Sequence, residues 1–419
     1  MKRIIYCLIL SLFVASYARA KTWTLGRQAN AYSGEQNWMT DENGWSVYLS
    51  DNSNTSMKNG TIGLMATTRT SSAIRSSGGN GTLDLRDIVI LQNGIEYPIT
   101  NVTLTKFAFS FTRNRSVTNI FINNVSNLGN GVLLAKNDSD STGCAVKDVR
   151  ISGTFSVVPD YAFTYASSVT NIMLDSPNLT KIGNKAFFFT RSVTTDLSEI
   201  VLPTVRHIGN SAFAADGSGS SGKINSFRGG VVLDNLDYLG TSAFLQTQYL
   251  SHFIAKGGNV ESLASGETGA WVGIFYGCSA LKKVEFHCNS LNNIGSKVFN
   301  KATAVTECLI GSTNLVTMGN NASWAGLTKL RFYGAASTTA VDRFLSGIST
   351  SASTKKCTIY VPRDRKFGWK NVADSMTSAE LSVAHPENCI GVYRNGSRKA
   401  WMVYLSSPLT PKATVLKVR

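Results

Sequence analysis

The sequence predicts a repeat solenoid that is mainly β, with short irregular or helical return segments and a parallel sheet along one face. Two observations predict this fold class. A short phrase that contains glycine and phenylalanine recurs along the chain, and an alternating apolar pattern follows its copies at a nearly constant distance. Such periodicity is typical of a solenoid, in which one unit can bury its apolar side chains only against its neighbours.

The recurring phrase reads apolar-Gly-x-x-Ala/Val-Phe, and its clear copies lie at residues 182–187, 208–213, 239–244 and 294–299. Weaker copies end at Phe163 and Phe275. The phenylalanines from Phe163 to Phe299 are 24, 26, 31, 31 and 24 residues apart, which is within or just beyond the period of leucine-rich repeats. We expect each glycine to allow a tight bend or a positive φ. Each phenylalanine should insert between turns as the large core residue.

The second element reads apolar-x-x-apolar-x-apolar, which is typical of a short strand with one buried face. Seven copies are present, and they begin at Val117, Val169, Leu197, Leu250, Leu281, Val305 and Leu327. The middle residue of the last three should point away from the core, because side chains alternate across a strand. With a degenerate copy at residues 231–233, this predicts an exposed row on the sheet: Phe121, Met173, Val201, Val232, Ile254, Glu285, Leu309 and Arg331.

Most of this row is apolar, although an exposed sheet face is ordinarily polar. A continuous apolar strip marks an interaction site or a surface that another part of the chain covers. Alternatively, these residues serve β-propensity alone. Glu285 and Arg331, with the neighbouring lysines, should make the C-terminal half of the row charged.

The complete repeat, I-G-x-x-A-F-x-x-(C)-x-x-L-x-x-φ-x-φ-P, resembles that of the BspA-like leucine-rich-repeat family of microbial surface and secreted proteins. Residues 182–187 and 208–213 match its first half, 275–281 its middle and 197–203 its strand. Residues 358–362 resemble the way such arrays end, so the likeness covers roughly residues 100–365. The chain departs from the family pattern by insertions at 216–227 and 257–269, and most repeats lack the cysteine. The resemblance implies adhesion or ligand binding at a cell surface, with no fixed ligand.

The ends of the chain have features of their own. Residues 1–20 predict a signal peptide, with Lys2 and Arg3 before a short apolar run and small residues at Ala18 and Ala20. We therefore expect a secreted or cell-surface protein, and one that is not transmembrane, because every apolar run is too short to span a bilayer. We expect a β-containing, partly flexible cap over 21–95 and a solenoid of about 8 repeats over 96–350. A C-terminal cap over 351–419 should contain a β-hairpin that turns at Asn395-Gly396.

Charge and cysteine content limit the classes of binding partner and the disulfides that the chain can form. The first 20 residues carry three basic and no acidic residues, so their removal lowers the net charge from +15 to +12. This charge favours an anionic polymer or glycan as partner, or serves only solubility. The basic residues are scattered, which argues against a specific nucleic-acid partner. Disulfides are permitted outside the cell, and Cys357 with Cys389 is the favoured pair.

No catalytic motif stands out. The G-x-G-x-x-G run at 217–222 lies in an insertion and is interpreted as a flexible loop. We therefore expect no catalytic residues, no cofactor and no metal. The function expected is an exported, non-enzymatic binding or adhesion protein that engages an extracellular protein or polymer. Two alternatives stay open: a structural protein that self-associates at the cell surface, and an exported enzyme that acts on polysaccharide.

Overall fold

The structure is a computed structural model, and the residues it describes are 21–30, 34–50, 56–64, 74–76, 81–105, 108–109, 117–132, 145–215, 225–264, 273–319, 326–333, 357–361, 372–373, 389–395 and 398–404. Every structural statement below concerns these residues. The expected signal peptide, the G-x-G-x-x-G run, Cys144 and the residues Gly396–Ser397 of the hairpin turn lie outside them.

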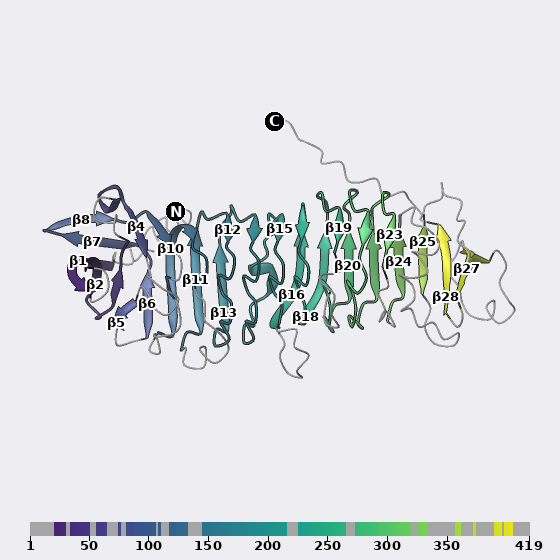
Figure 1. The fold of residues 1–419 in the computed structure, drawn as a ribbon, viewed down its shortest axis with the longest axis horizontal. Coiled ribbons are helices and arrows are strands. Elements are labelled where there is room, and N and C mark those ends of the chain that lie inside the picture. Colours follow the sequence, from purple (N-terminus) through teal and green to yellow (C-terminus); the bar gives the residue numbers. More distant parts are fainter. Residues whose placement is uncertain are drawn as a thin grey trace, which may run out of the picture.

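The molecule is an elongated stack of short strands that lie side by side along its long axis (Figure 1). Most strand pairs are parallel, and two short 3-10 helices are described, η1 (Met57–Asn59) and η4 (Leu197–Glu199). The expected fold class, a mainly β repeat solenoid with a parallel sheet along one face, is confirmed.

The longest run of parallel pairing forms one side of the stack, which we call the ladder face. It consists of two sheets in succession, separated at η4. The strands of the first are β6 (Thr82–Leu85), β10 (Asn119–Leu128), β11 (Asp148–Gly153) and β13 (Asn171–Asp175). The strands of the second are β16 (Asn225–Leu233), β18 (Thr247–Ala255), β20 (Lys283–Phe286), β22 (Glu307–Ile310), β24 (Lys329–Phe332), β25 (Thr358–Val361), β28 (Arg398–Tyr404), β27 (Cys389–Asn395) and β26 (Val372–Ala373).

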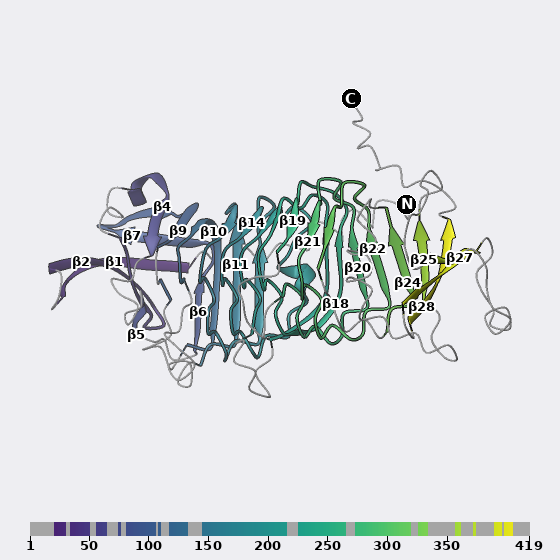
Figure 2. The same ribbon diagram turned by 45° about the vertical axis from the view of Figure 1, so that its right-hand side comes forward.

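A second row of very short parallel strands runs beside the ladder face, where the chain returns from one rung to the next (Figure 2). We call this side, which the recurring phrase forms, the return side. Its strands are β12 (Val157–Val158), β14 (Lys181–Ile182), β15 (His207–Ile208), β17 (Tyr238–Leu239), β19 (Ser262–Leu263), β21 (Asn293–Ile294) and β23 (Thr317–Met318). Near the N-terminus, β9 (Asn101–Leu104) pairs with the second half of β10, and β4 (Thr61–Leu64) pairs with β9.

The N-terminal end carries a separate, mostly antiparallel sheet. Its order is β5 (Ile74–Ser76), β3 (Ser46–Tyr48), β2 (Gly34–Asp41), β1 (Lys21–Asn30), β7 (Ile88–Gln92) and β8 (Ile95–Pro98). Trp23 and Trp45 are buried in it, and they belong to the same apolar cluster that continues through the solenoid to Met402. One hydrophobic core therefore runs from the N-terminal sheet to β28.

A column of stacked phenylalanine rings forms the centre of this core. Phe163, Phe187, Phe213, Phe244, Phe275 and Phe299 are each 0% exposed. Successive ring centroids lie 5.0 to 5.8 Å apart, and the rings are within 4° to 7° of parallel. The expectation that phenylalanine is the large residue inserted between turns is confirmed.

The glycine of the recurring phrase is required for a reason other than a positive φ. At Gly209 an added Cβ would lie 2.6 Å from the backbone nitrogen of Asn184 in the preceding repeat. The left-handed conformation is instead adopted two residues later, as at Lys185 (φ 51°) and Ser211 (φ 54°). Glycine is needed here because neighbouring repeats stack backbone against backbone, which leaves no room for a side chain.

Polar side chains replace the cysteine that most repeats lack. Cys278 Sγ donates a hydrogen bond to the carbonyl of Phe244 in the preceding repeat (3.1 Å), and Thr247 Oγ1 donates in the same way to Phe213 (2.9 Å). Asn225 Nδ2, which comes after the insertion, also reaches the Phe213 carbonyl (2.7 Å). Burial raises the pKa of the Cys278 thiol, so it stays protonated and able to donate. The departure from the family pattern therefore preserves a buried donor.

The favoured disulfide between Cys357 and Cys389 is wrong, because both thiols are free. Cys357 directly precedes β25, Cys389 begins β27, and β28 lies between these two strands. Two strand spacings separate the α-carbons by about 10 Å, which exceeds the roughly 7 Å that a disulfide can span. The strands on either side of the Asn-Gly turn do pair antiparallel, with Asn395 opposite Arg398.

Candidate binding face

The register of the ladder places the row residues beside one another. In the first sheet, Asp84, Phe121, Arg150 and Met173 are successive partners. In the second sheet, the partners are Val232, Ile254, Glu285, Leu309, Arg331 and Tyr360. Asp84, Arg150 and Tyr360 were not predicted as members of the row. For Arg150 the signal was present, since Val146, Val149 and Ile151 follow the apolar spacing of the other strands.

The side chains of the row differ in exposure. Met173 is 40% exposed, and Phe121, Val232, Ile254, Glu285 and Arg331 are half-buried. Leu309 is buried at 4% exposure, and its Cδ2 lies only 3.5 Å from where a Cβ at Gly311 would be. Its expected exposure is therefore wrong, because the leucine lies down over this glycine.

Val201 is also buried, at 1% exposure, and it does not lie on a strand. The segment expected to form its strand begins with the 3-10 helix η4. Asp196 is the N-cap of η4 and its carboxylate accepts from Ser198 N (2.9 Å), while Glu199 lies in the first turn. Acidic residues at these two positions favour a helical start. Val201 therefore turns toward the core, and the parallel sheet is interrupted between β13 and β16.

In the N-terminal part of the face, two arginines flank Phe121. The guanidinium carbons of Arg86 and Arg150 lie 5.1 and 5.2 Å from the centre of its ring. Each arginine is held by an aspartate of its own rung, at 2.7 Å from Asp84 and 2.8 Å from Asp148. Burial alone would raise the pKa of the Asp84 carboxyl, but hydrogen bonds from Arg86 and Lys21 outweigh it and lower the pKa to about 2. The result is a patch in which two guanidinium groups adjoin one aromatic ring.

In the C-terminal part, the face carries ion pairs. Glu285 pairs with His287 at 3.1 Å and with Lys283 at 2.9 Å. Glu307 lies 3.6 Å from Lys329 on the neighbouring rung. The hydrogen bond from His287, joined by that from Lys283, lowers the pKa of the Glu285 carboxyl to about 2 against the opposing effect of burial. The C-terminal half of the row is therefore charged, as expected, but most of its charges pair with one another.

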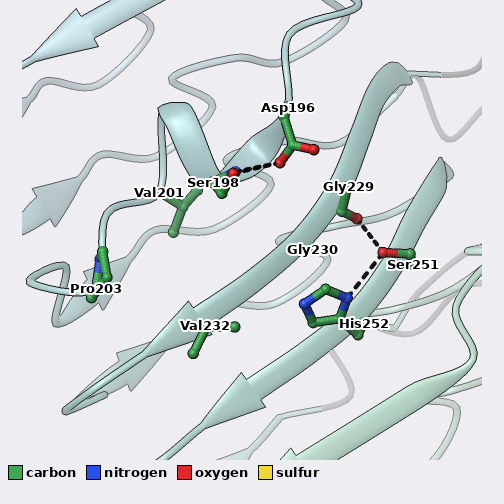
Figure 3. Close-up of a pocket in the computed structure, with 9 residues that line it drawn as sticks. All are labelled: Asp196, Ser198, Val201, Pro203, Gly229, Gly230, Val232, Ser251 and His252. Atoms are coloured by element: carbon green, nitrogen blue, oxygen red, sulfur yellow. Dashed lines mark hydrogen bonds between the residues drawn. The ribbon is translucent and has the colours of Figure 1, made fainter.

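A pocket of about 420 Å³ lies at the break between the two sheets (Figure 3). Its lining comes from three segments: η4 and the residues after it, β16, and β18. The lining residues are Asp196, Ser198, Val201, Pro203, Gly229, Gly230, Val232, Ser251 and His252. Two of them, Val201 and Val232, belong to the predicted row, and the other seven were not predicted as site residues. The adjacent glycines in β16 were the overlooked signal, because paired glycines in a strand indicate a bulge or a close approach.

Within the described part of the chain, no group of three His, Cys, Asp or Glu side chains is placed to hold a metal ion. Among the same residues, no helix has the length and apolar character that crossing a bilayer requires.

Solved structures with similarity to the chain include the following two. One is a leucine-rich repeat protein from Bacteroides ovatus ATCC 8483, at 14% identity over 73% of this chain and 91% of that one, with a TM-score of 0.24. The other is the pneumococcal vaccine antigen PcpA, at 12% identity over 78% and 94%, with a TM-score of 0.23. No curated protein matches. A family model described as a BspA type leucine-rich repeat region, with 6 copies, matches residues 91–220, 142–268 and 223–332. These matches span more than half of the chain, which therefore belongs to the BspA-type leucine-rich-repeat family.

Proposed function

We propose that this protein is an exported binding or adhesion protein that engages an extracellular protein or polymer through its ladder face, without catalysis. The membership in a leucine-rich-repeat family supports a binding role, because solenoids present extended surfaces that are used for recognition. The signal-peptide pattern at residues 1–20 supports export.

The observation that carries the proposal is the row itself. Its side chains are in register across the rungs, and most of those that are exposed or half-buried are apolar or arginine. The core of a protein interface is enriched in aromatic residues, methionine and arginine, and Phe121, Arg150 and Met173 adjoin one another here. The ion pairs at the C-terminal end would give the face a polar margin.

Binding of the mature chain to an array of purified extracellular proteins and of neutral and anionic polysaccharides tests this function. The double variant Phe121→Asp with Ile254→Asp places two carboxylates on the row. We expect it to weaken binding to the captured partner by about tenfold or more, as the loss of central interface side chains does.

The matched control places two carboxylates on the return side instead. Val316 and Tyr161 are 63% and 42% exposed there, and Val316→Asp with Tyr161→Asp should leave binding within about twofold. Equal binding by both double variants and the unaltered protein would remove the ladder face as the binding surface.

Mass spectrometry of the exported protein tests the expected signal peptide, and we expect the mature chain to begin at Lys21.

A further inference from the structure

The pocket at the break in the ladder face has a floor made of backbone. A Cβ added at Gly229 would lie 2.0 Å from Asp196 Oδ2, and one added at Gly230 would lie 2.0 Å from His252 Cε1. The carboxylate and the imidazole therefore rest directly on this glycine pair, one from each side, as Figure 3 shows. Gly229 also has a positive φ of 78°, which favours glycine.

Hydrogen bonds orient both polar groups. Asp196 Oδ1 accepts from Ser198 N (2.9 Å) and from Ser198 Oγ (2.7 Å). Its other oxygen, Oδ2, accepts no hydrogen bond from any described residue. The carboxylate is therefore held by one oxygen and offers the second to the pocket.

The histidine is fixed in one tautomer. Ser251 Oγ donates its only hydrogen to the Gly229 carbonyl at 2.8 Å. The contact of 3.0 Å between Ser251 Oγ and His252 Nδ1 therefore requires that Nδ1 carries the proton and donates it. In the neutral ring, Nε2 is then a bare acceptor, and within the described chain it has no partner.

The pocket thus offers hydrogen-bond acceptors from two walls, and its remaining wall is apolar, formed mainly by Pro203 and Val232, since Val201 is almost fully buried. A matching ligand carries several donors on its edge and an apolar face, which describes a sugar ring with its hydroxyl groups and C–H surface. The volume of about 420 Å³ lies within the range typical of small-molecule sites.

A cationic side chain would also supply donors, but the charge of the protein opposes it. The mature chain carries a net charge of +12. Arg228, whose guanidinium lies 5.5 Å from the ring of Tyr249, is the strand partner of Asp196. This positive environment favours a neutral donor over an ammonium or guanidinium group.

We propose that this pocket binds one neutral sugar residue of a glycan, with Asp196 Oδ2 and His252 Nε2 accepting from its hydroxyl groups. This inference rests on the proposed function, because it names the chemistry that one part of the ladder face recognises.

Saturation-transfer NMR followed by titration calorimetry on the mature chain tests it, with a panel of neutral methyl glycosides and with agmatine as the cationic probe. At least one glycoside should bind. Asp196→Asn keeps the acceptor for Ser198 but turns the free oxygen into a donor, so it should weaken that glycoside by about tenfold or more. Asp234→Asn removes the same charge elsewhere on the face, where Asp234 pairs with Lys256 at 2.9 Å, and should leave affinity within about twofold.

A second variant keeps the test independent of the capping role of Asp196. Ser251→Ala frees Nδ1 of His252, allows the proton to move to Nε2 and should weaken the glycoside several-fold while the far-ultraviolet circular dichroism stays unchanged. Binding of agmatine without any glycoside, absence of binding by every probe, or glycoside binding unchanged in Asp196→Asn would each overturn the inference. If glycosides fail while Phe121→Asp with Ile254→Asp still loses the captured partner, the pocket proposal alone fails. If that double variant keeps its partner as well, both proposals fail.

Discussion

The return side and the ladder face belong to the same repeats, yet they vary in opposite ways. On the return side the same residue types recur at most turns, because the stacked rings and the close backbone approach leave little choice. On the ladder face the outward position of successive rungs changes from Asp84 to Phe121 to Arg150. The comparison teaches that the return side sets the spacing of the solenoid, which leaves the ladder face free to vary and to carry recognition. Stability and binding should therefore respond to different substitutions.

The largest expected effect is on the return side. Phe213→Ala removes a ring that stacks on Phe187 at 5.0 Å and on Phe244 at 5.3 Å. The cavity left in a fully buried column should lower the free energy of unfolding by about 3–5 kcal/mol, measured by urea denaturation. Val316→Ala, at a 63% exposed position, should change it by less than about 0.5 kcal/mol. A small effect at Phe213 would mean that the column does not hold the repeats together.

Glu285 on the ladder face is an exception, because it should contribute to the stability of the fold. This contribution should be lost at low pH. The folded-state pKa of Glu285 is lowered to about 2 from its ordinary 4.5, so its stabilisation is complete above pH 4.5 and is lost as the pH falls from 4.5 toward 2. The contribution is about 3 kcal/mol at most.

Urea denaturation of the protein and of Glu285→Gln at pH 7 and pH 2.5 measures this contribution. The difference between the two should shrink at the lower pH. Glu307→Gln is the control, since Glu307 is 42% exposed and its contact with Lys329 is longer, at 3.6 Å. A difference for Glu285→Gln that does not depend on pH would contradict the assigned ion pairs.

Gly209→Ala tests whether the return side depends on close contact between the backbones of neighbouring repeats. The added methyl group would lie 2.6 Å from the Asn184 nitrogen, so two repeats must separate locally, at about 1–3 kcal/mol. Gly26→Ala is the matched control, because no atom lies within 4 Å of the added Cβ and Gly26 has no positive φ. Thermal unfolding of the two variants compares them directly. Equal melting temperatures would show that the close approach is not required.

The smallest expected effect concerns the buried donors. Cys278→Val keeps the shape of the side chain but removes one of the two donors to the Phe244 carbonyl and leaves only the Thr247 N–H, which should cost about 1 kcal/mol. Cys278→Thr should be nearly neutral, because Thr247 makes the same bond one repeat earlier. Chemical denaturation measures the free energy of unfolding of the two variants. A Cys278→Val variant as stable as Cys278→Thr would refute the hydrogen-bonding role.

The sequence predicted the regular parts of this molecule well, because the glycine, the phenylalanine and the alternating strand residues report directly on stacking. Phe187, Phe213, Phe244 and Phe299 are all buried in the column, as their spacing indicated. Six of the eight predicted residues of the row lie at least partly exposed on the ladder face, because the row follows from the two-residue period of a strand, whereas Val201 and Leu309 are buried.

The structure differs from the prediction where local backbone interactions, which the apolar pattern does not encode, decide the conformation. Leu197 and Ile200 keep the spacing of a strand and are buried as expected, but the Asp196 cap starts a helical turn between them. The pocket depends on this turn and on Gly229 and Gly230, which lie against Asp196, 33 residues before Gly229, and His252, 22 residues after Gly230. The paired glycines are visible in the sequence, but only the fold shows that these segments meet.

The account depends on ring-to-ring contact between successive repeats, and a double-mutant cycle of Phe187→Leu and Phe213→Leu measures it most directly. Urea denaturation of both single variants and the double variant should give a coupling free energy of about 0.5–1.5 kcal/mol. Phe163→Leu with Phe299→Leu, at opposite ends of the column, should give additive losses. Additive losses for Phe187 and Phe213 as well would contradict a solenoid held together by stacked phenylalanines.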